Sequence, residues 1–116
     1  MYEKRDKSLS AYPKVTIQLA KDFIHNNYQF PIGIDDVAKN ANVTPNYLST
    51  VFQKEVKMTT KRYLTMIRME KAMTLLQSGH YKIKEVSEMV GYSNQLYFSN
   101  EFKKYYGKSP LNYLNK

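Results

Sequence analysis

Small polar and basic side chains recur at helical spacing between residues 95 and 106, where they could bind an external partner. Gln95, Ser99, Asn100 and Lys103 are left facing outward by that spacing. The apolar positions between them predict a face turned toward a core: Tyr97, Phe98, Phe102 and Tyr105. Amide and hydroxyl groups can pair with the edges of nucleic-acid bases, and lysine attracts phosphate. The pattern therefore predicts polar recognition of a polyanion.

A second helix is expected directly before this segment. Ile83, Val86 and Val90 recur at three- and four-residue spacing and predict one buried face. Gly91 follows, where a helix end favours a residue that tolerates a left-handed backbone. Ser93 or Asn94 can then cap the next helix through a side-chain oxygen. Two short helices hinged at a glycine predict a helix-turn-helix unit.

The same pattern occurs earlier in the chain. Ile34 and Ile83 lie 49 positions apart, Phe52 and Phe102 lie 50 apart, and Asn42 stands in the place of Gly91. The closing pair Tyr63-Leu64 likewise corresponds to Tyr113-Leu114. A repeat of this length predicts two copies of one supersecondary unit.

Composition argues against catalysis and metal binding. The 116 residues include no cysteine, which removes thiolate chemistry and cysteine-based zinc sites. His25 and His80 have no neighbouring carboxylate cluster, and Asp35-Asp36 is expected to begin a helix rather than form a catalytic pair, with the Asp35 carboxylate as its cap. We predict no enzyme activity, no cofactor and no metal. The absence of long apolar windows and of cysteine predicts a cytoplasmic protein without a membrane partner.

The periodicity predicts an all-α fold of about seven helices. Residues 1–12 are expected to be a flexible N-terminal or linker segment, and residues 13–116 the folded domain. Its first helix is predicted to bury Val15, Leu19 and Phe23, together with Ile24. The remaining elements are predicted as a first helix-turn-helix at 34–56, a long linker helix at 59–78, a second helix-turn-helix at 83–106 and a terminal helix at 110–115.

These residues resemble the DNA-binding domain of the AraC/XylS family of bacterial transcription regulators. The stretch GYSNQLYFSNEFKKYYGKSPLNYL is similar to the family's closing motif, and the segment from Tyr63 through Arg68 to Leu76 is similar to its linker helix. Asn42 and Lys57 stand where a glycine is usual, and Asn100 where many members carry arginine. The resemblance implies a DNA-binding transcription factor that acts as an activator, whose two helix-turn-helix units enter successive major-groove segments of promoter DNA.

Two sets of residues are predicted to contact DNA. Base contacts are expected from exposed positions early in each recognition helix: Asn46, Ser49, Thr50, Gln95, Leu96, Ser99 and Asn100. Asn and Gln can pair with adenine, and Leu96 could touch the methyl group of thymine. Phosphate contacts are expected from Lys54, Lys61, Arg62, Lys84, Lys103 and Lys104. Arg68 is expected instead to bind a neighbouring acidic group.

The formal charge of +8 and the 11 tyrosines also allow a different function. A basic helical module could bind single-stranded RNA or acidic protein surfaces, and a preference for duplex DNA would separate the two hypotheses. The resemblance further implies contact with RNA polymerase, and dimerisation through a domain outside this chain, the isolated domain being a monomer. The charged start before Pro13 favours a piece of a longer regulator over a complete one-domain protein.

Overall fold

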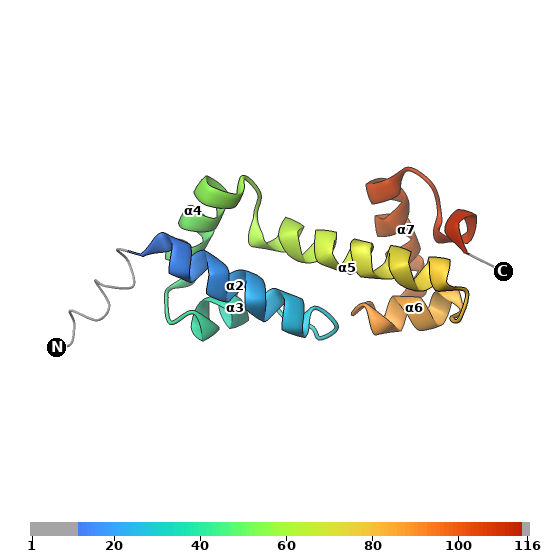
Figure 1. Cartoon of the computed structure of the whole chain (residues 1–116), viewed down its shortest axis with the longest axis horizontal. Helices are drawn as coiled ribbons and strands as arrows, with labels where there is room; N and C mark the ends of the chain where they lie inside the picture. The colour runs from blue at the N-terminus through green and yellow to red at the C-terminus, as the bar shows by residue number, and fades with distance from the viewer. Residues whose placement is uncertain (1–11, 115–116) are drawn as a thin grey trace. The chain divides into compact units, whose positions relative to one another are not determined.

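The computed structural model describes residues 12–114, and within that range the chain is helical with no strand. Six α-helices and one 3-10 helix follow in this order (Figure 1): α2 (Pro13–Asn27), α3 (Ile34–Asn40), α4 (Pro45–Val56), α5 (Thr60–Ser78), α6 (Ile83–Met89), α7 (Gln95–Tyr106) and η1 (Pro110–Tyr113). The prediction of an all-α fold with two helix pairs and one long helix is confirmed. The segment 1–11 and residue 115 of the predicted terminal helix lie outside the described residues.

The chain forms two compact units. Unit 1 combines the residues up to Asn27 with Ile32–Leu64, and unit 2 combines Tyr28–Pro31 with the residues from Thr65 onward. In unit 1, α2 packs against both helices of the α3–α4 pair. In unit 2, α7 packs against α6 and η1. Each unit therefore contains one complete helix-turn-helix pair.

The buried face of α2 differs from the predicted one. Val15 is 48% exposed and Leu19 37% exposed, so these two predicted core positions are wrong, whereas Ile24 is buried as predicted. The buried residues of the helix are Thr16, Ile17, Ala20 and Ile24. Small side chains at two of these positions allow the close approach of α3 and α4, a packing requirement that hydrophobicity alone does not reveal.

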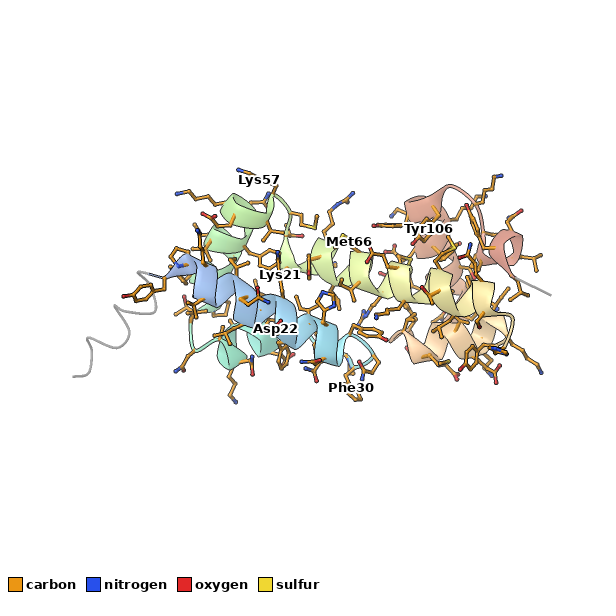
Figure 2. The ribbon with its side chains drawn as sticks, viewed as in Figure 1. Lys21, Asp22, Phe30, Lys57, Met66 and Tyr106 are labelled. Atoms are coloured by element: carbon orange, nitrogen blue, oxygen red, sulfur yellow. The ribbon has the colours of Figure 1, made fainter. Side chains whose placement is uncertain are left out.

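Left-handed residues end corresponding helices in the two units. Gly91 has φ +99° after α6, and Asn42 has φ +63° after α3. Gly107 has φ +86° after α7, and Lys57 has φ +68° after α4 (Figure 2). Asn42 and Lys57 thus adopt the same left-handed backbone conformation as Gly91 and Gly107 at the corresponding positions. This conformation costs less free energy for Asn than for Lys.

Side-chain caps fix where the recognition helices begin. Thr44 Oγ1 accepts the Tyr47 backbone N–H at 3.1 Å at the start of α4. Asn94 Oδ1 accepts the Tyr97 N–H at 2.9 Å at the start of α7, so Asn94 rather than Ser93 is the cap. At α3 the predicted cap is wrong, because Asp36 and not Asp35 accepts the backbone N–H of Gly33, at 2.9 Å. Asp36 is the third residue of the helix, which lets its side chain reach back to the cap residue.

Aromatic residues form much of the core of unit 2. Phe98 and Phe102, one turn apart on α7, are fully buried. Tyr106 continues this stripe and donates its hydroxyl to the Met69 carbonyl at 3.2 Å. Tyr97 and Tyr105 were predicted to face the core, but they are 55% and 40% exposed. The four-residue spacing of the buried stripe leaves both tyrosines on its flanks.

Candidate nucleic-acid interface

The outer face of α4 carries the predicted base-contacting residues of unit 1. Leu48, Val51 and Phe52 are buried and fix the orientation of the helix. That orientation exposes Asn46, Ser49 and Thr50, together with Gln53 and Lys54 one turn further on. The exposed face therefore offers one amide and two hydroxyl groups in the first half of the helix, followed by an amide and a cation.

The outer face of α7 has the same layout. Burial of Phe98 and Phe102 exposes Gln95, Leu96 and Asn100. Ser99 is only partly exposed, so it is less accessible than the other predicted base-contacting residues. Both recognition helices are 12 residues long, and their faces correspond at an offset of 50, Ser49 with Ser99 and Lys54 with Lys104.

The predicted phosphate-contacting residues are all exposed. They lie on α4, at the start of α5, on α6 and on α7: Lys54, Lys61, Arg62, Lys84, Lys103 and Lys104. Lys104 Nζ also lies 3.7 Å from Glu101 Oε2. Since exposed ion pairs within one helix contribute only about 0.3–0.5 kcal/mol, this pair leaves Lys104 able to exchange its partner for a phosphate.

Two residues of the exposed faces are absent from the predicted site. Gln53 lies one and two turns beyond Thr50 and Asn46, on the same side of α4. Tyr97 lies in the first turn of α7, where 55% of its surface is exposed. The spacing of Phe98 and Phe102 already placed Tyr97 off the buried stripe, but its aromatic character favoured a core position.

Arg68 binds backbone carbonyls rather than the predicted acidic group. Its Nε donates to Tyr28 O and its Nη2 to Phe30 O, both at 2.8 Å, and Phe30 itself projects outward from this loop (Figure 2). The guanidinium lies over the Tyr92 ring, 5.5 Å from its centroid. Burial lowers the pKa of Arg68 and raises the pKa of Tyr92 to about 12. Arg68 thus links the loop at Tyr28 and Phe30 to the Tyr92 ring in the turn between α6 and α7, and its Nε and Nη2 groups are occupied by these carbonyls.

The histidine and carboxylate side chains of the described residues form no metal-binding cluster. Within residues 12–114 no group of three or more His, Asp and Glu side chains is arranged to hold a metal ion. His25 Nε2 lies 3.0 Å from the hydroxyl of Tyr63, a contact inside unit 1. Among the helices of the described chain, none combines the length and the apolar composition that a membrane crossing requires.

Comparison with known proteins identifies this architecture. Residues 37–116 match the family described as "Helix-turn-helix domain". The C-terminal domain of AraT, a response regulator from Geobacillus stearothermophilus, superposes with a TM-score of 0.82 at 39% identity, over 84% of this chain and 82% of that one. The chain belongs to the AraC family of helix-turn-helix DNA-binding domains. The family prediction is confirmed, and so is the prediction that this domain is not an enzyme.

Two curated relatives of this AraC-type domain are operon regulators. The Lactose operon transcription activator of Staphylococcus xylosus is 42% identical over 97 residues, which cover 84% of this chain and 35% of that protein. The Msm operon regulatory protein of Streptococcus mutans is 35% identical over 108 residues, which cover 93% of this chain and 37% of that protein. The chain thus spans about a third of each relative. Neither relative supports the alternative of an RNA-binding or acidic-surface-binding module.

Proposed function

We propose that this domain recognises two successive major-groove segments of promoter DNA, one through α4 and the other through α7. The observation that supports it is the correspondence between two capped 12-residue helices, whose outward faces carry polar residues at matching positions. Successive major-groove segments on one side of a duplex lie about 34 Å apart. The proposed base-contacting residues are Asn46, Ser49, Thr50, Gln95, Leu96, Ser99 and Asn100.

The amide side chains would supply most of the polar base discrimination. Asn46, Gln95 and Asn100 are exposed and can each form two hydrogen bonds with one adenine. Ser49 and Thr50 can donate to or accept from several bases, so they discriminate less. We therefore expect each proposed segment to contain at least one preferred adenine.

The six exposed cations Lys54, Lys61, Arg62, Lys84, Lys103 and Lys104 are proposed to bind phosphates. Six released counterions give a slope of about −5 for log affinity against log salt. Lys103→Gln should reduce the steepness of this slope by about one. Lys14→Gln, an exposed lysine on α2 outside the proposed site, serves as the control and should leave the slope unchanged.

We also propose that residues 13–116 act as the DNA-binding part of a longer cytoplasmic regulator. The relative from Staphylococcus xylosus is named a transcription activator, and the chain spans about a third of it. By that analogy the domain would activate transcription beside RNA polymerase. It would bind DNA as a monomer when isolated, and any dimerisation would depend on another domain.

Selection of bound duplexes from a random DNA pool tests the two-segment proposal. The expected result is an enriched site with two short blocks about one helical turn apart. Asn46→Ala should relax base preference in one block only, and Gln95→Ala in the other. Asn26→Ala, an exposed residue at the end of α2, should change neither block. Enrichment of a single block would refute readout by the second unit, and binding of single strands without duplex enrichment would favour the alternative module.

A further inference from the structure

The first turn of α7 exposes two large apolar side chains. Leu96 is 70% exposed and Tyr97 is 55% exposed, although both lie on the face that is otherwise polar or charged. The corresponding residues of α4 are Asn46, which is polar, and Tyr47, which is only partly exposed. The two recognition helices therefore differ in chemistry at the same position of their first turn.

The ring of Tyr97 packs against the ring of Tyr92. Its centroid lies 5.7 Å from that of Tyr92, at an interplanar angle of 50°. Tyr92 is itself buried, and its ring lies 5.3 Å from that of Phe98 in the core. A supported ring loses little conformational entropy on binding, so its exposed surface is ready for a partner. Leu96, the preceding residue, adds an apolar surface that is 70% exposed.

Only one base presents an apolar group in the major groove, namely thymine through its C5-methyl. The other base edges present hydrogen-bond donors and acceptors, which lose water without gaining a partner when they meet a leucine. Leu96 in the first turn of α7 is therefore matched to thymine and mismatched to cytosine, guanine and adenine, whereas Tyr97 contributes the apolar face of its ring beside a hydroxyl that can still form a hydrogen bond.

We propose that Leu96 and Tyr97 recognise thymine methyl groups, so that methyl contacts in the DNA segment bound by α7 add to the amide readout by Gln95 and Asn100. The position of α4 that corresponds to Leu96 carries Asn46, which would form hydrogen bonds instead. This inference rests on the proposed two-segment readout and adds a second basis of specificity in the second segment. Only the second DNA segment would then be selected in part through a thymine methyl group, so exchanging the two segments within the site would lower the affinity.

Replacement of thymine by uracil in the selected duplex tests the inference, because it removes the methyl group and leaves base pairing intact. Binding of the full chain should weaken about fourfold at the thymine that Leu96 contacts, the effect of one methyl-sized group. Leu96→Ala should bind the thymine and uracil duplexes equally at that position, and Tyr97→Ala should do so at any thymine that Tyr97 contacts. Leu111→Ala is the matched control: it removes a leucine that is 60% exposed but lies in η1, and it should keep the fourfold ratio.

Leu96→Asn provides a gain-of-preference test, because it gives α7 the residue type of Asn46. Its selected site should change from thymine to adenine at one base pair of the second block. Equal binding of the unsubstituted chain to thymine and uracil would overturn the methyl inference alone. A thymine preference that survives both alanine substitutions would also overturn it. Failure to enrich any duplex would instead refute the two-segment readout, and the inference with it. Leu96 is 70% exposed, so Leu96→Ala should leave the unfolding midpoint unchanged, which separates its effect on binding from folding. Tyr97→Ala also removes a ring that packs against Tyr92, so its midpoint should fall, and its binding is compared at a temperature below that midpoint.

Discussion

Substitution of Gly91 by alanine tests how closely unit 2 packs around the turn between α6 and α7. A Cβ atom at this position would lie 2.6 Å from the carbonyl oxygen of Tyr28 and 3.0 Å from both Nε and Nη2 of Arg68. Those two nitrogens donate the hydrogen bonds that hold the loop at Tyr28 and Phe30. The methyl group would therefore strain the backbone, at φ +99°, and also displace the guanidinium.

The backbone strain and the displacement of the guanidinium each lower the free energy of unfolding by an amount that can be assessed separately. A left-handed backbone costs an L-residue about 1–2 kcal/mol relative to its preferred conformation. Loss or distortion of a hydrogen bond to a charged group costs about 1.5–3 kcal/mol. Gly91→Ala should accordingly lower the free energy of unfolding by about 2.5–5 kcal/mol. Gly107→Ala is the matched control, because Gly107 also has positive φ (+86°) but has nothing within 4 Å of its added Cβ. The control should lose only about 1–2 kcal/mol.

Urea unfolding followed by circular dichroism measures both variants, and a double-mutant cycle with Arg68→Ala isolates the contact. In the Arg68→Ala background the cost of Gly91→Ala should fall, because the guanidinium is no longer present to be displaced, but it should stay above that of Gly107→Ala, because the carbonyl oxygen of Tyr28 still lies 2.6 Å from the added Cβ. Equal losses for Gly91→Ala and Gly107→Ala in the unsubstituted background would refute the reasoning. So would a cost of Gly91→Ala that does not depend on Arg68.

Three further predictions concern stability. Lys57→Gly should raise the free energy of unfolding by about 0.5–1 kcal/mol, measured by urea unfolding, because Lys57 has φ +68°. Thr16→Val should raise it by about 1 kcal/mol in the same assay, since the buried Thr16 hydroxyl has no hydrogen-bond partner among the described residues; a loss would show that the hydroxyl is satisfied. Folding raises the pKa of Tyr92 from 10.0 to about 12, so the stabilisation from its neutral form is complete below pH 10 and is lost as the pH rises through about 12. Thermal unfolding from pH 9 to 12 should therefore show a smaller alkaline loss in Tyr92→Phe, and identical profiles would contradict the assignment.

The features that depend on neighbouring residues could be predicted from the sequence. The repeat at 49 and 50 positions predicted both helix pairs, because apolar spacing fixes which helix face is buried. The cap of α7 was narrowed to Ser93 or Asn94, because a cap bonds to a backbone N–H only two or three residues away, and the structure selects Asn94. The positive φ at Asn42 follows from its place in the repeat, opposite Gly91. The exposed faces of α4 and α7 follow from the same spacing, and this gave most of the proposed DNA-contacting residues.

The features that depend on distant residues could be seen only once the helices are packed. Arg68 binds carbonyl groups 38 and 40 positions away, and no local pattern distinguishes a carbonyl partner from an acidic one. The buried face of α2 depends on its packing against α3 and α4, which covers Ile17 and Ala20 and leaves Val15 and Leu19 exposed. The contact between the Tyr97 ring and the buried Tyr92 ring likewise depends on how the turn before α7 folds back on that helix. The 3.6-residue period of a helix is set by hydrogen bonds between residues four positions apart. Which of several apolar faces of that helix is buried depends on the elements that pack against it.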